Sequence, residues 1–114
     1  MTIKSEVTFD DFLKLDIRVG RIVEASQFEK ARKPSYKLVV DMGPGIGLKN
    51  SSAQITEHYT PEELVDKQVL AVVNFPPRSI AGFISEILVM GTYSEGGVVL
   101  ITPDKSVQEG DILG

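Results

Sequence analysis

The chain has 114 residues, of which 42% are hydrophobic and 25% are charged, as expected for one globular domain spanning residues 1–114. The absence of cysteine excludes disulfides, thiolate metal sites and cysteine nucleophiles. The net charge of −4 argues against a generic nucleic-acid binder, because phosphate contacts need lysine and arginine.

No apolar run approaches the ~20 residues of a membrane-spanning helix, so we expect no membrane partner. Residues 1–15 are of mixed polarity and carry acidic side chains, which is not the pattern of a signal peptide. A cytoplasmic location is therefore the simplest expectation.

Basic side chains are concentrated in one stretch of the chain. Residues 30–50 contain five cations and a single acid, Asp41, so their local net charge is +4 (5 − 1). The cations are Lys30, Arg32, Lys33, Lys37 and Lys49. This stretch is either a solvated loop that happens to be basic or an electropositive face on an acidic protein.

The N-terminal part predicts a short helix followed by a strand. Thr8 is a good N-cap for the helix, and its apolar face consists of Phe9, Phe12 and Leu13. Residues 16–25 alternate as a strand, but strict alternation would place Arg21 on the apolar face. We therefore expect a bulge near Gly20.

The middle of the chain predicts three strands and a helix. Residues 36–42 alternate between apolar and polar side chains, and residues 43–47 are glycine-rich and indicate a hairpin turn. Residues 48–55 form a more polar strand. Thr60 followed by Pro61 and Glu63 is a strong helix start, and residues 69–73 form the next strand.

The segment Asn-Phe-Pro-Pro-Arg at residues 74–78 predicts a stiff loop, because proline cannot continue a paired strand. Residues 85–91 and 98–102 predict two strands around a turn at 93–97, with a last short strand near 111–113.

This order of elements predicts an all-β fold. We expect a five-stranded OB-fold barrel with a short helix between strands 3 and 4 and a short N-terminal helix. A β-sandwich is the alternative, although the well-capped helix fits the barrel better.

The sequence offers little for catalysis. His58 is the only histidine, and a surface position explains it. Glu62 and Glu63 are adjacent at a helix start, where acids stabilise the helix dipole. Known nucleophile, zinc-protease and nucleotide-loop patterns do not occur. We expect neither an enzyme nor a metal or cofactor site.

Binding residues are more numerous. The cations that could meet phosphates are Arg18, Lys33, Lys37, Lys49 and Arg78. The side chains that could make directional hydrogen bonds are Asn50, Ser51, Asn74 and Ser85, although Asn74 and Ser85 could equally cap strand ends. Glu86, which is flanked by apolar residues, needs a cationic partner, and Arg78 or Arg18 is the expected one.

Aromatic residues make up only 7% of the chain. Tyr36, Phe75 and Phe83 are the plausible platforms for base stacking, and core packing is expected for at least two of them. If RNA is the ligand, recognition of a folded RNA by its shape and backbone therefore fits better than reading of a single strand.

Several motifs, in order, resemble the tRNA-binding (EMAP-II-like) OB-domain family. They are Leu-Asp-Ile-Arg-Val-Gly-Arg-Ile at 15–22, Tyr-Lys-Leu at 36–38, Tyr59 with Pro-Glu-Glu-Leu at 61–64, Val-Asn-Phe at 73–75, and Gly82 with Ser85 and Glu86. Segments 31–38, 48–56 and 74–78 resemble a stand-alone bacterial branch of this family. That resemblance implies a cytoplasmic homodimer, described as an export-related chaperone that also binds tRNA. Phe9, Phe12 and Leu13 would contribute to the dimer contact.

The leading hypothesis is a chaperone-like protein that holds unfolded or pre-export polypeptides beside the 74–78 loop, with export machinery as a further partner. It would also bind tRNA through residues 30–50. The alternatives are a primarily structure-specific tRNA-binding protein, and an interaction protein with no ligand of its own.

Overall fold

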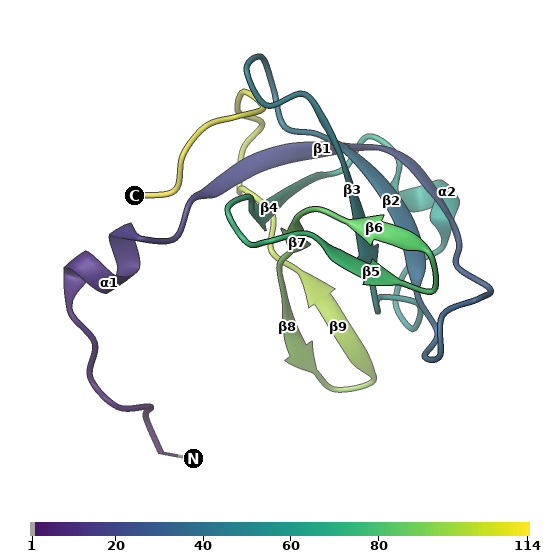
Figure 1. Cartoon of the computed structure of the whole chain (residues 1–114), viewed down its shortest axis with the longest axis horizontal. Helices are drawn as coiled ribbons and strands as arrows, with labels where there is room; N and C mark the ends of the chain where they lie inside the picture. Colours follow the sequence, from purple (N-terminus) through teal and green to yellow (C-terminus); the bar gives the residue numbers. More distant parts are fainter. Residues whose placement is uncertain (1) are drawn as a thin grey trace.

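The computed structural model describes residues 2–114, which form two short helices and nine strands (Figure 1). In chain order they are α1 (Phe9–Leu13), β1 (Ile17–Gln27), β2 (Tyr36–Asp41), β3 (Leu48–Ala53), α2 (Pro61–Leu64), β4 (Gln68–Val72), β5 (Arg78–Ile80), β6 (Phe83–Ser85), β7 (Leu88–Val89), β8 (Gly91–Ser94) and β9 (Gly97–Leu100). Neither helix in this range is long and apolar enough to cross a membrane.

Five strands form the barrel in the order β3-β2-β1-β4-β7, and each neighbouring pair is antiparallel. The 11-residue β1 is shared, because its first half pairs with β4 and its second half pairs with β2. The helix α2 follows β3 and precedes β4. The predicted five-stranded OB barrel with a helix between strands 3 and 4 is confirmed, and the β-sandwich alternative is excluded.

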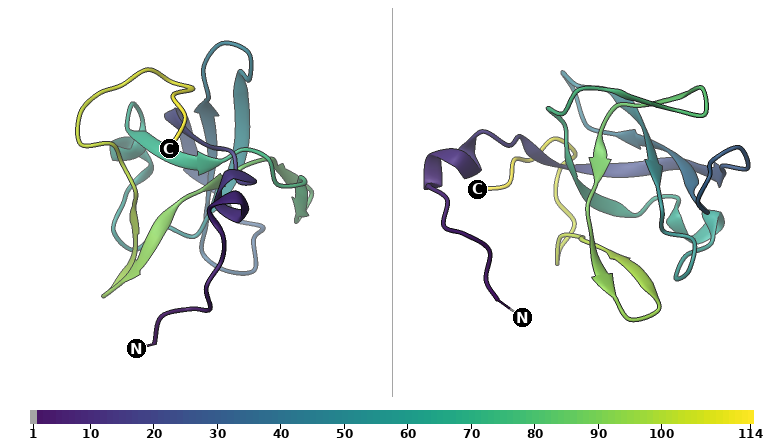
Figure 2. Two further views of the ribbon diagram at one scale, coloured as in Figure 1. Left: turned by 90° about the vertical axis from the view of Figure 1, so that its left-hand side faces the viewer. Right: turned by 60° about the horizontal axis from the view of Figure 1, so that its bottom comes forward.

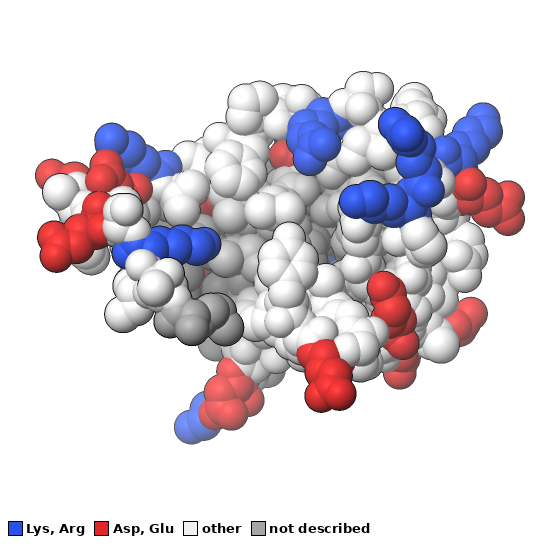
Figure 3. All heavy atoms as spheres, turned by 90° about the horizontal axis from the view of Figure 1, so that it is seen from below, with Lys and Arg blue, Asp and Glu red and all other residues white. Residues whose placement is uncertain are grey.

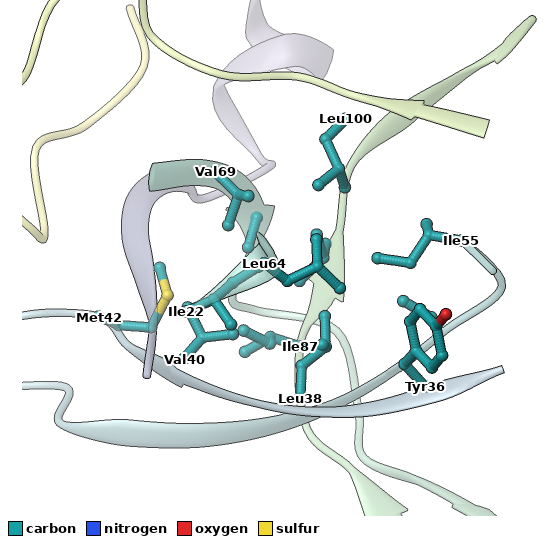
Figure 4. Close-up of a cluster of buried hydrophobic side chains, with 13 residues drawn as sticks. Ile22, Tyr36, Leu38, Val40, Met42, Ile55, Leu64, Val69, Ile87 and Leu100 are labelled. Atoms are coloured by element: carbon teal, nitrogen blue, oxygen red, sulfur yellow. The ribbon is translucent and has the colours of Figure 1, made fainter. Parts of the chain in front are cut away.

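The barrel interior is filled by apolar side chains from all five of these strands (Figure 4). Tyr36, Leu38 and Val40 of β2 point inward, as their alternation predicts, and the helix α2 contributes Leu64. Side chains this well shielded each stabilise the fold by roughly 1.5–3 kcal/mol relative to exposure. A domain of this size therefore has a sufficient core without disulfides.

A second, smaller apolar cluster lies on the other face of β1 and β4. It consists of Ile17, Val19, Leu70 and Val72, with Phe12, Met90 and Ile101 packed against it. The two clusters exist because successive strand residues face opposite sides, so Val69 and Ala71 enter the barrel while Leu70 and Val72 leave it.

The bulge expected near Gly20 lies instead at Val23, where the pairing of β1 with β2 shifts between Ile22 and Glu24. Gly20 has a different role, because a β-carbon there would overlap Met42 Sδ and lie 2.6 Å from Val40 Cγ1. Arg21 stays on the outer face. It is accommodated there by a hydrogen bond from Nη1 to the carbonyl oxygen of Asp66, at 2.7 Å.

The stiff loop expected after β4 is in part a hairpin. The prolines at 76 and 77 lie outside any strand, but β5 and β6 pair from Arg78–Ser85 to Ile80–Phe83. The strand expected at 85–91 is therefore divided among β6, β7 and the start of β8. The turn between β8 and β9 is found where predicted.

The C-terminal segment hydrogen-bonds to the first half of β1, which does not pair with β2. The N–H of Val19 donates to the carbonyl of Asp111 at 2.9 Å, and the N–H of Leu113 donates to that of Ile17 at 2.8 Å. The last predicted strand is thereby reduced to one bridge, between Arg18 and Ile112.

The helix α1 stands away from the barrel at one end of the molecule (Figure 2). Thr8 caps it as predicted, since its hydroxyl accepts from the N–H of Asp11 and the Asp11 carboxylate accepts from the N–H of Thr8. Phe9 and Leu13 are 70% and 58% exposed, whereas Phe12 packs against the second cluster.

Candidate functional site

The connection between β1 and β2, residues 28–35, carries three basic side chains and one acidic one, and we call it the basic loop. Its ends are anchored, because Phe28 and Ser35 are buried and the N–H of Phe28 donates to the carbonyl of Ser35 at 3.1 Å. Lys30, Arg32 and Lys33 between them are exposed. Figure 3 shows a group of basic side chains at the end of the molecule opposite α1.

A pocket of about 400 Å³ separates the basic loop from the β5–β6 hairpin, and we call it the hairpin pocket. Its lining consists of Gln27, Phe28, Glu29, Lys30, Lys37, Ala81, Gly82 and Phe83. The rings of Phe28 and Phe83 meet edge to face with centroids 5.3 Å apart. Lys37 Nζ lies over both rings, 5.0 Å from the Phe28 centroid and 5.4 Å from that of Phe83.

The tip of the hairpin is a two-residue turn in which Ala81 has φ 48° and Gly82 has φ 83°. Two positive φ values in succession are typical of a type I′ turn, whose twist matches that of the paired strands. Glycine adopts this geometry freely, but alanine does so at a cost of about 1–2 kcal/mol. The tip that borders the pocket is therefore strained.

A second pocket, of about 390 Å³, lies at the C-terminal end of the basic loop, and we call it the tyrosine pocket. Its lining consists of Lys33, Pro34, Gln54, Glu57, Tyr93, Ser94, Gly97 and Val98. Tyr93 of β8 is fully exposed at this pocket. His58 Nε2 lies 3.1 Å from the carbonyl oxygen of Glu95 and so ties the β8–β9 turn to the 56–58 turn.

Four of the predicted binding residues close the barrel, where β3 and β6 lie side by side without strand pairing. The N–H of Asn50 donates to Glu86 Oε1 at 3.0 Å, and the N–H of Ser52 donates to Ser85 Oγ at 3.0 Å. The buried hydroxyl of Ser51 donates to the carbonyl of Ile87 at 3.1 Å. Asn50, Ser51, Ser85 and Glu86 thus replace the missing strand pairing.

The expected partner of Glu86 was wrong. Lys49 Nζ lies 3.6 Å from Glu86 Oε2, whereas Arg18 forms a two-point contact with Asp16 at 2.8 and 3.1 Å. This hydrogen bonding to Asp16 raises the pKa of Arg18 above its ordinary value. Arg78 is exposed at the base of the hairpin, opposite Ser85.

Asn74 holds the segment between α1 and β1. Its Oδ1 accepts from the N–H of Asp16 at 2.9 Å, and its Nδ2 donates to the carbonyl of Lys14 at 2.8 Å. Capping was one of the two interpretations of this side chain, and the structure supports it.

The structure therefore places Lys30 and Lys37 at the hairpin pocket and Lys33 at the tyrosine pocket, with the exposed Arg32 between Lys30 and Lys33 in the basic loop. Arg18 and Lys49 lie in ion pairs elsewhere. Phe28 and Tyr93 were missed by sequence reasoning, because nothing local links residue 28 to residue 83 or residue 33 to residue 93. Within residues 2–114, no three histidine, cysteine, aspartate or glutamate side chains gather as a metal site would require.

Comparison with known proteins gives one matching family model, described as "Putative tRNA binding domain", over residues 17–112. The methionine–tRNA ligase of Parabacteroides distasonis is 38% identical over 109 residues, which are 95% of this chain and 16% of that enzyme. The corresponding ligase of Archaeoglobus fulgidus is 37% identical over 107 residues, again 16% of its length. The chain thus spans about one sixth of these curated relatives.

Two solved structures match almost the whole chain. The CsaA chaperone protein from Picrophilus torridus is 53% identical with a TM-score of 0.91, and the match covers 96% of this chain and all of that protein. The chaperone CsaA from Bacillus anthracis is 45% identical with a TM-score of 0.90 and the same coverage. CsaA is the stand-alone branch that segments 31–38, 48–56 and 74–78 resemble.

Proposed function

Because the chain belongs to the tRNA-binding domain family whose model matches residues 17–112, we propose that it binds tRNA in the cytoplasm and is not an enzyme. The observation that carries this proposal is the exposed basic loop beside Lys37. Phosphate contacts dominate RNA affinity, and they need exposed cations that are not already paired with a carboxylate of the protein.

The cations of the basic loop meet that requirement better than Arg18 and Lys49, two of the cations expected from the sequence to contact phosphate. Among residues 2–114, Lys30, Arg32 and Lys33 have no carboxylate within ion-pair distance, whereas Arg18 and Lys49 are paired with Asp16 and Glu86. We therefore assign the main phosphate contacts to the basic loop and to Lys37, with Arg78 and Lys49 as secondary contacts.

A salt series tests the proposal. Binding of tRNA should weaken steeply as salt rises, and neutralising Lys30, Arg32 and Lys33 together to glutamine should reduce both the affinity and the salt slope. The matched control is the triple change of Lys4, Lys67 and Lys105 to glutamine, which alters the net charge equally at other places. Equal losses from the two triple variants, or no binding at low salt, would contradict the proposal.

A second function is favoured by the two chaperone structures that match 96% of the chain. We propose that the protein also holds unfolded or pre-export polypeptides, for delivery to export machinery, on the surface that follows β4. Phe75, Ile84 and Leu88 are 44%, 48% and 48% exposed there, and such side chains suit extended apolar segments.

Light scattering of an aggregating client tests this second function. The protein should suppress the signal, and changing Phe75 and Ile84 to serine should weaken suppression while tRNA binding is kept. Suppression that is unchanged by this double variant would place the client surface elsewhere. The absence of suppression would contradict the chaperone function itself.

We further propose that the protein is a homodimer joined through α1. The exposed side chains of Phe9 and Leu13 stand off the barrel on a capped helix, and a second copy would cover them. Phe12 supports the contact from within its own chain, because it packs against the second apolar cluster.

A further inference from the structure

The hairpin pocket and the tyrosine pocket are lined by the two ends of one basic loop. The hairpin pocket uses Phe28, Glu29 and Lys30 from this loop, whereas the tyrosine pocket uses Lys33 and Pro34. They share no lining residue, and Ala31 and Arg32 separate them in the chain. A ligand that filled both pockets would have to pass over the exposed cations of the loop.

Each pocket combines an accessible aromatic ring with a cation. In the hairpin pocket, the half-buried ring of Phe83 is fixed by Phe28, and Lys37 brings an ammonium to the same place. In the tyrosine pocket, the fully exposed ring of Tyr93 stands near Lys33 and Pro34. Ring faces bind unstacked bases, and cations bind the phosphates between them.

The polar groups of the pockets suit the edges of bases. Gln27 and the backbone of Ala81 and Gly82 border the first ring, and Gln54 and Ser94 border the second. Amide, hydroxyl and backbone groups can both donate and accept hydrogen bonds. A double helix could not use these rings, because its bases are already stacked on one another.

We propose that an unpaired RNA segment crosses the basic loop, with one base against Phe83, another against Tyr93, and the intervening phosphates on Arg32 and Lys33. This inference rests on the proposed tRNA function and narrows it, since the protein would contact an unpaired part of the RNA as well as its folded shape. The positive charge of the loop favours this occupant over an apolar polypeptide.

The test compares three RNA probes on the full chain: tRNA, an oligoadenylate of about twelve nucleotides carrying 2-aminopurine, and a duplex of the same length. The variants are Phe83→Leu and Tyr93→Ser, with Val65→Ser as the control, because Val65 is an exposed apolar side chain outside both pockets. Circular dichroism would verify that each variant is folded. Should Phe83→Leu disturb the hairpin, Tyr93→Ser carries the test, since its ring is fully exposed.

The single strand should bind more tightly than the duplex and quench 2-aminopurine fluorescence. Phe83→Leu and Tyr93→Ser should each weaken single-strand binding about five- to tenfold, with the salt slope unchanged, because only stacking is removed. Val65→Ser should leave binding unchanged.

If tRNA binds with a steep salt dependence but the two pocket variants bind the single strand like the wild type, the inference is wrong and the proposed function remains. If the duplex binds as well as the single strand without quenching, the inference is also wrong. If none of the three RNAs binds at low salt, both the inference and the proposed function fail.

Discussion

Asn50 and Glu86 bond to each other twice across the barrel closure. The Asn50 N–H donates to Glu86 Oε1 at 3.0 Å, and the Glu86 N–H donates to the Asn50 carbonyl at 2.8 Å. The Glu86 side chain here accepts a backbone N–H that a neighbouring strand would accept elsewhere in the barrel. The Glu86 side chain, which sequence reasoning assigned to ligand binding, thus helps to close the barrel.

The first prediction concerns this closure. Glu86→Ala should lower the free energy of unfolding by about 1–3 kcal/mol, because it leaves the Asn50 N–H without its acceptor. Glu86→Gln keeps an acceptor oxygen and should cost less. Urea denaturation measures both, with Glu95→Ala as the control at an exposed acid. A loss of RNA affinity in Glu86→Gln at unchanged stability would instead indicate direct ligand contact.

The second prediction concerns Asn74. Asn74→Ala should destabilise the protein by about 1–2 kcal/mol and speed hydrogen exchange at the Asp16 amide, which would lose its acceptor. Asn74→Asp retains an acceptor for that amide but no donor for the Lys14 carbonyl. Exchange at the Asp16 amide should therefore be intermediate between the wild type and Asn74→Ala. Unchanged exchange at Asp16 in Asn74→Ala would show that this clamp is unimportant in solution.

The third prediction concerns the hairpin tip. Ala81→Asn should raise the free energy of unfolding by about 0.5–1 kcal/mol, since asparagine tolerates the left-handed conformation better than alanine. Ala81→Val should lower the free energy of unfolding, because a β-branched side chain tolerates the left-handed conformation least. Thermal denaturation would decide, and a stabilising Ala81→Val would mean that the turn has another geometry.

The fourth prediction separates the two aromatic residues of α1. Phe9→Ser should yield monomers in sedimentation with little change in thermal stability, because the side chain is 70% exposed. Phe12→Ser should lower thermal stability, because this ring packs against the second apolar cluster. Dimers that persist in Phe9→Ser would refute the proposed contact through α1.

Much of the fold could be predicted, because its signals are local. The barrel follows from the alternation in residues 36–42, from the capping residue Thr60 and from the order of strands around α2. The capping residue Thr8 predicts α1. The family resemblance read from short motifs is confirmed by the family model and the solved structures.

The site was harder to predict, because its contacts join distant segments. Phe28 meets Phe83 only after both strands are placed in the barrel, and no periodicity encodes that meeting. The β5–β6 hairpin was missed since its turn is Ala-Gly rather than the usual Asn-Gly or Asp-Gly. The bulge was misplaced because Gly20 is required by the approach of Met42, not by a bend.

The C-terminal crossing of β1 also bears on solubility. Asp111 and Leu113 occupy backbone groups of Val19 and Ile17 that would otherwise form an open strand edge. Exposed edges of this kind are templates for intermolecular pairing. Proteolytic removal of the last five residues should therefore expose this edge of β1 and cause the protein to polymerise edge to edge.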